Sequence, residues 1–227
     1  LNSTLAVILI TCAAAPLITA SAAGRLKVRM LESEPQPAGG KRTRINNTLI
    51  GVANAITTPA IVELAVLMRN TRGPHTFYAL HVRNDNSRTS KALSEASLEA
   101  ARQTAAAADT PIETLDRFDL NTVTGVLNAI EERDITEIML GMHRRATVID
   151  SFFGNKIDQL LRSTNRMVII SRCYIPPGTI TRVVVWVPAD AQYETGFNRW
   201  VRALSRLTRQ VGCRIIFCCP GEVQPLI

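Results

Sequence analysis

Histidine and aromatic residues are scarce in this sequence of 227 residues. It contains three histidines, and Phe, Trp and Tyr together make up 5% of the chain. The five cysteines form no C-x-x-C pair, so neither a zinc site nor a disulfide framework is expected, and a reducing compartment is predicted. These shortages exclude most histidine-based metal centres and catalytic triads.

Several loop motifs that carry chemistry are also missing. The sequence has no G-x-x-x-x-G-K-[ST], no G-x-G-x-x-G and no G-x-S-x-G. A P-loop, a dinucleotide fingerprint and a nucleophile elbow are therefore excluded. No HIGH-like or S-G-G-x-D-S motif follows the first predicted strand, which disfavours nucleotidyl transfer or amidation. We expect no enzymatic activity and no metal.

The net charge of +7 is unevenly distributed. Residues 45–173 carry 14 basic and 14 acidic side chains, whereas residues 25–44 carry six basic and two acidic ones. Residues 180–227 add six basic and three acidic side chains. A nucleic-acid surface concentrates basic charge on the folded domain, so we expect no nucleic-acid partner.

The first 24 residues contain no charged side chain. Leu5–Ala23 is apolar over the roughly 20 residues needed to span a bilayer, and Arg25, Lys27 and Arg29 follow directly. This pattern predicts a transmembrane helix at residues 1–24 with the following residues on the cytoplasmic side. Its many alanines suit a bundle of neighbouring helices. A truncated signal peptide ending at Ala20–Ala22 and a buried soluble helix are the alternatives.

Residues 25–47 are predicted to form a basic linker. Pro35–Gly40 can hold neither a helix nor a central strand. The basic residues lie where anionic headgroups would be, so attraction to a membrane surface and a simple solvated tether are both open.

From Thr48 onward, apolar strand patterns alternate with amphipathic helices. The predicted strands are Thr48–Asn54, Thr76–Arg83, Ile112–Phe118, Glu137–Met142 and Arg166–Ser171. The predicted helices are Pro59–Arg69, Ser90–Asp109, Asn121–Glu132 and Phe153–Thr164, with Thr57 or Thr58 capping the first and Asn121 or Thr122 the third. This order predicts an α/β domain at residues 48–173 with a five-stranded, parallel, doubly wound sheet.

Ligands of such sheets bind beyond the carboxyl ends of the strands. The residues to inspect are therefore Asn54, His81 to Arg83, and the loop after Gly141, which contains His143. We interpret His81 as a structural residue because it lies within an apolar strand, and His143 as a solvated loop residue.

A second, incomplete α/β copy is predicted at residues 180–227. Arg182–Asp190 and Cys213–Cys219 are its strands and Gly196–Val211 is its helix, so Thr181–Cys219 repeats the order of Thr48–Arg83. On this helix Arg199, Arg202, Arg206 and Arg209 share one face, interpreted as solvated or as a contact with sequence outside this chain.

The stretch from Glu137 to Ser171 resembles the phosphate loop of universal stress proteins. That pattern is Gly, two residues, Gly, nine residues, Gly, then Ser or Thr. Here Gly141, Arg144, Gly154 and Asn155 stand at the four positions, so Arg144 replaces a glycine and Asn155 replaces the hydroxyl.

Other positions carry the same resemblance. The strand end at Val82 is similar to the adenine-side strand of the family, and Asn54 stands where ATP-binding members have Asp. Val187–Asp190 is similar to the end of the family's first strand, so Asp190 takes the place of Asn54 in the second copy. The resemblance implies that ATP or another adenine nucleotide is a conceivable ligand; we otherwise expect no cofactor.

The N-terminus has a resemblance of its own. Thr11-Cys12, followed by Thr19–Arg25, is similar to the last membrane helix of bacterial cation/proton antiporters, some of which carry tandem universal-stress-like domains. We therefore expect the C-terminal part of a sodium/proton antiporter in the inner membrane. Its expected partners are the bilayer, upstream transmembrane helices and a second copy in a homodimer. The rival interpretation is a nucleotide-binding universal stress protein without transport activity.

Overall fold

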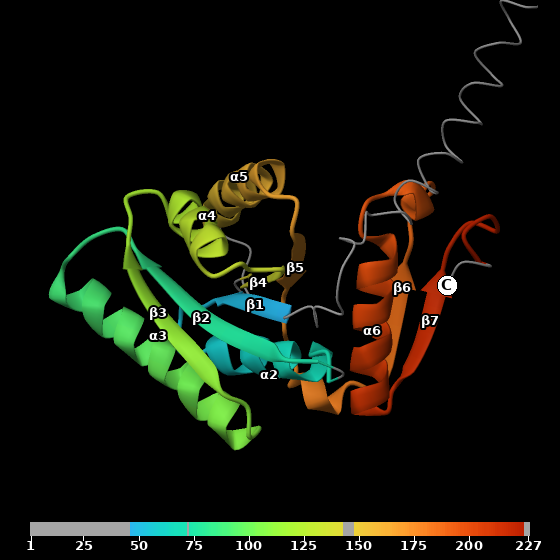
Figure 1. Cartoon of the computed structure of the whole chain (residues 1–227), viewed down its shortest axis with the longest axis horizontal. Coiled ribbons are helices and arrows are strands. Elements are labelled where there is room, and N and C mark those ends of the chain that lie inside the picture. The colour runs from blue at the N-terminus through green and yellow to red at the C-terminus, as the bar shows by residue number, and fades with distance from the viewer. Residues whose placement is uncertain (1–45, 72, 143–147, 225–227) are drawn as a thin grey trace, which may run out of the picture. The chain divides into compact units, whose positions relative to one another are not determined.

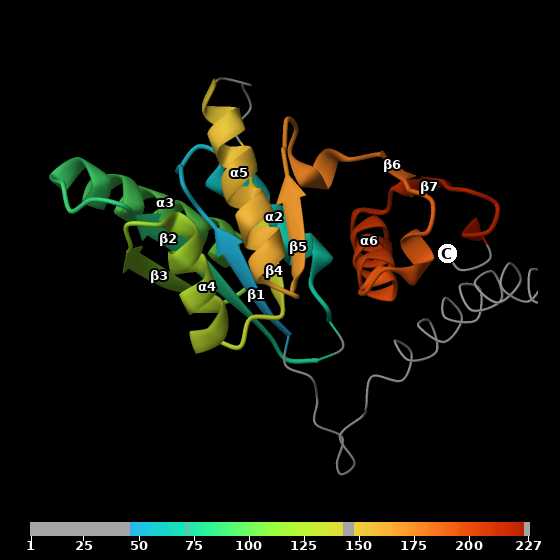
Figure 2. The same cartoon turned by 90° about the horizontal axis from the view of Figure 1, so that it is seen from above.

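The computed structural model describes residues 46–71, 73–142 and 148–224. Five strands form one sheet in the order β3-β2-β1-β4-β5, and every neighbouring pair is parallel (Figures 1 and 2). The strands are β1 (Asn46–Gly51), β2 (His75–Arg83), β3 (Ile112–Phe118), β4 (Glu137–Gly141) and β5 (Met167–Ser171). The predicted five-stranded parallel α/β sheet is thereby confirmed.

Four helices connect these strands. They are α2 (Thr58–Met68), α3 (Arg88–Ala107), α4 (Thr122–Glu132) and α5 (Val148–Ser163). Helices α2 and α3 cover one face of the sheet, and α4 and α5 cover the other (Figure 1). From β1 the chain adds β2 and β3 on one side of the sheet, and then β4 and β5 on the other side. The topological switch point therefore lies between β1 and β4.

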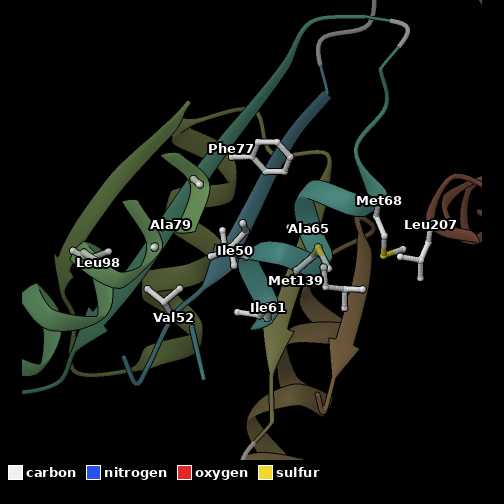
Figure 3. Packing of buried hydrophobic residues seen from close by; sticks show 14 of the residues in the cluster. Ile50, Val52, Ile61, Ala65, Met68, Phe77, Ala79, Leu98, Met139 and Leu207 are labelled. Atoms are coloured by element: carbon white, nitrogen blue, oxygen red, sulfur yellow. The ribbon is translucent and has the colours of Figure 1, made fainter. Parts of the chain in front are cut away.

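Alternation along each strand separates two hydrophobic clusters. Neighbouring residues of a strand face opposite sides, so Ile50 joins the cluster beneath α2 and α3, whereas Leu49 joins the cluster beneath α4 and α5. Phe77 and Tyr78 divide in the same way on β2. Figure 3 shows the first cluster, in which Ile50, Phe77 and Met139 of three strands meet side chains of α2 and α3.

Helix caps differ in how well the sequence predicts them. Asn121 caps α4, because its Oδ1 accepts a hydrogen bond from the amide of Val123 at 2.9 Å. Thr57 precedes α2 but makes no side-chain cap hydrogen bond, and Thr58 instead donates to the Asn54 carbonyl at 2.8 Å. The Asn121 cap is thus confirmed, while Thr57 takes the predicted N-cap position of α2 without a capping hydrogen bond from its side chain.

Among the predicted boundaries that shift, two bear on the predicted site. Strand β1 ends at Gly51, so Asn54 lies three residues beyond the strand rather than at its end. Helix α5 begins at Val148 rather than at Phe153. Gly154 and Asn155 therefore lie in its second turn, not before a helix N-terminus.

Beyond β5 the chain continues as β6 (Arg182–Trp186), α6 (Phe197–Val211) and β7 (Arg214–Cys218), with β6 and β7 in a two-stranded sheet. Residues 42–185 and 198–216 form one compact unit, so most of α6 belongs with the five-stranded sheet. The predicted transmembrane helix and residues 25–45 of the predicted linker lie outside the described residues, whereas Asn46 and Asn47, also assigned to the linker, belong to β1. Within residues 46–71, 73–142 and 148–224, no helix is both long and apolar enough to cross a bilayer.

Candidate functional site

A small cavity lies at the carboxyl ends of β4 and β5. Its volume is about 20 Å³, which accommodates one water molecule. Ile56, Thr57, Ala60, Ile61, Gly141, Met142, Ser171 and Cys173 line it. The Oγ of Ser171 is buried and has no hydrogen-bond partner among the described residues. This edge of the sheet therefore combines a polar atom with a water-sized space.

Asn54 organises the loop between β1 and α2. Its Oδ1 accepts a hydrogen bond from the amide of Ile56 at 2.8 Å, which forms an Asx turn. Its carbonyl accepts from the amides of Thr57 and Thr58, at 3.2 and 3.0 Å. The loop itself thus uses the oxygen atoms of Asn54. Ile56 and Thr57 of this loop line the cavity together with Gly141, so the structure brings two of the predicted site segments together.

The side chain of Val82 packs closely against helix α4. A Cβ placed on Gly125 of α4 would lie 2.9 Å from Cγ1 of Val82, which shows how closely the helix backbone approaches this side chain. The side chain of Val82 is partly buried against the second hydrophobic cluster. Gly125 was not identified from the sequence, although a glycine inside an amphipathic helix pattern signals a close approach of this kind.

The four positions of the phosphate-loop pattern are Gly141, Arg144, Gly154 and Asn155. The first ends β4, the last two lie within α5, and Arg144 is outside the described residues. Gly141 ends β4 at the cavity, whereas Asn155 is an exposed residue in the second turn of α5. Arg144 and His143 lie outside the described residues. The nearby Lys156 was not predicted, and its Nζ donates to the Thr122 Oγ1 at 3.3 Å.

Asp190 belongs to the separate unit that contains residues 186–197. It adopts a left-handed backbone conformation with φ +64°, and its carbonyl accepts from the amide of Tyr193 at 2.9 Å. A hollow of about 360 Å³ lies at the carboxyl ends of β6 and β7. Its lining residues are Trp186, Val187, Pro188, Ala189, Cys218, Cys219 and Pro220. Asp190 is therefore next to this hollow in sequence but does not line it.

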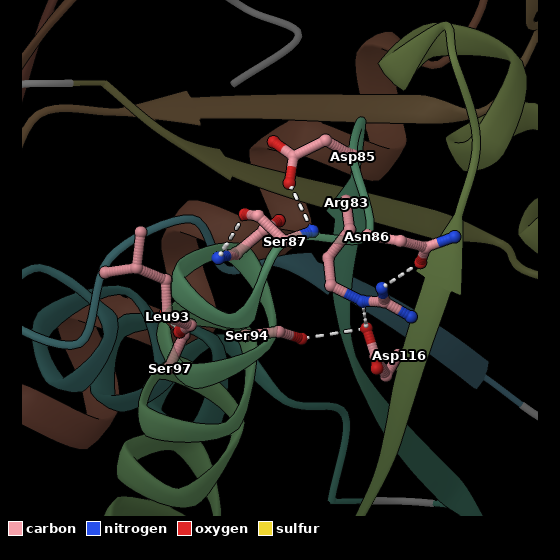
Figure 4. A network of polar contacts seen from close by, with 9 residues as sticks. Arg83, Asp85, Asn86, Ser87, Leu93, Ser94, Ser97 and Asp116 are labelled. Carbon is pink, nitrogen blue, oxygen red and sulfur yellow. Dashed lines mark hydrogen bonds and ion pairs between the residues drawn. The ribbon is translucent and has the colours of Figure 1, made fainter.

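A polar network joins β2, β3 and α3 (Figure 4). Arg83 donates from its Nε to Oδ1 of Asp116 at 2.7 Å, and Ser94 donates to the same oxygen at 2.8 Å. Partial burial favours the neutral acid, but the bonds from Arg83 and Ser94 outweigh it and lower the pKa of Asp116. Of these three residues the sequence pointed only to Arg83.

His81 lies beside Asp116 in the strand register and is 8% exposed. Burial lowers its pKa, while the charge of Asp116 and a hydrogen bond with the backbone of Val52 act in the opposite direction. His81 is thus a neutral core residue at pH 7, which confirms its structural interpretation. Within the part of the chain that the structure describes, no three His, Cys, Asp or Glu side chains are grouped to hold a metal ion.

Residues 68–172 match the family model described as the universal stress protein family. No curated protein shows a significant match to the chain. Among solved structures, a universal stress protein from Archaeoglobus fulgidus is 14% identical with a TM-score of 0.46, over 55% of this chain and 97% of its own. The structure of the universal stress protein from Archaeoglobus fulgidus in complex with dAMP is 14% identical with a TM-score of 0.45, over 55% of this chain and 96% of its own. A universal stress protein in complex with cAMP is 16% identical with a TM-score of 0.45, over 56% of this chain and 96% of its own.

Proposed function

Because residues 68–172 match the family model of universal stress proteins, we propose that this chain is the C-terminal, regulatory part of a bacterial cation/proton antiporter. In this proposal residues 1–24 form the last transmembrane helix in the inner membrane, and the residues after 25 are cytoplasmic. The bilayer, upstream helices and a second copy of the chain are its partners.

The observation that carries the proposal is the charge pattern of the first 47 residues. An uncharged apolar stretch, Leu5–Ala23, is followed at once by Arg25, Lys27 and Arg29, and then by the Pro35–Gly40 tether before the domain begins. Leu1–Gly24 contains no carboxylate. Because ion sites of such transporters use intramembrane carboxylates near the midplane, the transport site belongs to other helices and this part of the protein modulates it.

The domain supports modulation better than catalysis. The cavity at Gly141 is only large enough for about one water molecule, and Asn54 uses its oxygens within its own loop. An adenine nucleotide is the ligand class that the phosphate-loop resemblance suggests. Arg144 and Asn155 replace a glycine and a hydroxyl, so binding is weak or absent. A stand-alone, nucleotide-binding universal stress protein without transport activity is the alternative.

Extraction of membranes tests the membrane step of the proposal. The full chain, expressed in bacteria, should remain with the membrane pellet after alkaline carbonate treatment, because its apolar segment spans the bilayer. A variant with Leu9→Arg and Ile18→Arg should move to the supernatant, since central arginines make insertion unfavourable. Release of the unsubstituted chain by carbonate would contradict the proposal.

The reading frame upstream of Leu1 separates the two candidate functions. The antiporter requires about a dozen further apolar segments of spanning length ahead of residue 1. A start codon close to Leu1 would leave only the stand-alone protein.

A further inference from the structure

Helix α6 contributes to the core of the universal stress domain. Its residues Ala203 and Leu207 are 2% and 5% exposed, and they belong to the same hydrophobic cluster as Met68, the last residue of α2. Figure 3 shows the side chains of Met68 and Leu207 pointing toward one another. The helix therefore covers the end of α2 by apolar packing.

One arginine of α6 adds a polar anchor beside this packing. Arg206 donates from its Nε to the Met68 carbonyl at 2.8 Å. This carbonyl belongs to the last turn of α2, where carbonyls lack partners within the helix. The Nη2 of Arg206 lies 3.9 Å from Oε1 of Glu137, the first residue of β4. Arg206 thus contacts α2 and β4 at once, and its interpretation as part of a solvated face is wrong.

Glu137 continues into a buried relay. The Thr48 hydroxyl donates to Oε2 of Glu137 at 3.4 Å, and Nε2 of His75 lies 2.9 Å from the same hydroxyl. With the Thr48 hydroxyl donating to Glu137, the tautomer of neutral His75 that carries its proton on Nε2 completes the chain by donating to Thr48. The Nδ1 of His75 is buried and has no partner among the described residues. The relay therefore fits a neutral His75.

The charges around this relay come from several elements. Burial raises the pKa of Glu137, while Arg206 and Arg199 of α6 and the Thr48 hydroxyl oppose this rise. Burial lowers the pKa of His75 to about 4, and Arg206 and Arg69 add to that effect. Arg202 faces Arg206 along α6. The surroundings consequently keep His75 neutral, whereas burial and the arginines act on Glu137 in opposite directions.

We propose that α6 is a latch that detaches from the domain without unfolding it, and that Arg206 holds it in place through the Met68 carbonyl and the Glu137 carboxylate, beside a neutral His75. When α6 leaves, Glu137 and His75 lose the nearby Arg206 charge and part of their cover. The inference does not rest on the antiporter proposal, because every residue in it belongs to the compact unit that contains the sheet.

Amide hydrogen exchange, measured by mass spectrometry on the full chain in detergent micelles, tests the latch. Arg206→Met keeps the aliphatic stem and removes the donors, so exchange in α6 should rise about tenfold or more. Exchange in α4 should stay unchanged, because α4 packs on the opposite face. The matched control is Arg202→Met, which alters an exposed arginine of the same helix.

Three results would overturn the latch: unchanged exchange in α6, an equal rise in Arg202→Met, or a common rise in α6 and α4. Should Arg206→Met fail to fold, Arg206→Lys keeps the charge but loses the planar guanidinium, and exchange in α6 should rise in the same direction.

The same measurement between pH 4.5 and 6.5 tests the role of protons, after correction for intrinsic exchange rates. In His75→Asn no imidazole remains to gain a proton, so α6 should not open further as the pH falls below 6.5. In Glu137→Gln only His75 remains, so α6 should open more as the pH falls below the ordinary His value of 6.5. The unsubstituted chain, which retains His75, should likewise open more in acid than His75→Asn does. The same slope in all three proteins would overturn the proton link.

Discussion

Arg83 of β2 donates to Asp116 of β3 across 2.7 Å, and this ion pair ties the edge strand to its neighbour. The Arg83 side chain is 11% exposed and that of Asp116 is 42% exposed. The pair is therefore half in solvent, yet it has a second fixed partner in the Ser94 hydroxyl. We expect it to matter more than an isolated surface ion pair.

Asp116→Asn should lower the free energy of unfolding by about 1–2 kcal/mol. The charge-assisted bonds from Arg83 and Ser94 are lost, and the value is reduced because Asp116 is partly solvated. Urea unfolding of the full chain measures the change. The control is Glu99→Gln, which breaks the exposed pair with Arg102 and should change the stability by less than about 1 kcal/mol. Equal effects of the two substitutions would contradict the importance of the network.

His81 should make the protein less stable in acid. Burial lowers its pKa below the ordinary value of 6.5, so unfolding takes up a proton once the pH falls below 6.5. The stability contributed by neutral His81 is therefore present above pH 6.5 and is lost as the pH falls through the lowered pKa. Urea midpoints at pH 7.5 and 5 should differ less in His81→Gln than in the unsubstituted chain. His75 keeps part of the acid dependence in both proteins, so an unchanged difference would show that His81 does not titrate on unfolding.

Gly125→Ala should destabilise the domain by about 1–3 kcal/mol through overpacking. The new Cβ would lie 2.9 Å from Val82 Cγ1 and 3.2 Å from Asp119 Cβ. Alanine favours a helix over glycine by about 1 kcal/mol, and the clash must exceed that gain. Adding Val82→Ala should recover much of the loss, because it removes the contacting methyl groups. A Gly125→Ala protein that is more stable than the unsubstituted chain would refute the close approach.

ATP should show no micromolar binding to the full chain in isothermal titration calorimetry. The cavity at Gly141 is far too small for a nucleotide, and a phosphate favours the N-terminus of a helix. Asn155→Ser should leave this result unchanged, because residue 155 lies in the second turn of α5 rather than at its start. Micromolar affinity in either protein would contradict this account of the edge.

The sequence predicted the sheet well because its strands are short apolar runs bounded by turn residues. Glu137–Gly141 is one such run. The preference of asparagine for the N-cap position correctly predicted that α4 begins after Asn121. The start of α5 was predicted too late, because a helix boundary depends on local hydrogen bonds that a periodic pattern does not contain.

The role of Arg206 could not be predicted. Four arginines on one helical face look alike in sequence, yet only the fold brings Arg206 to the Met68 carbonyl. Gly125 and Asp116 were missed for the same reason, since their partners lie 43 and 33 positions away, at Val82 and Arg83.

The cover that Ala203 and Leu207 provide for Met68 bears on where the chain can be cut. A shortened protein that ends at Cys173 would expose the apolar side chain of Met68 and the carboxyl group of Glu137 to water. The exposed methionine would favour self-association. Anyone who wishes to isolate this domain should retain the chain through Cys218, or else replace Met68 and Glu137 with residues that tolerate solvent.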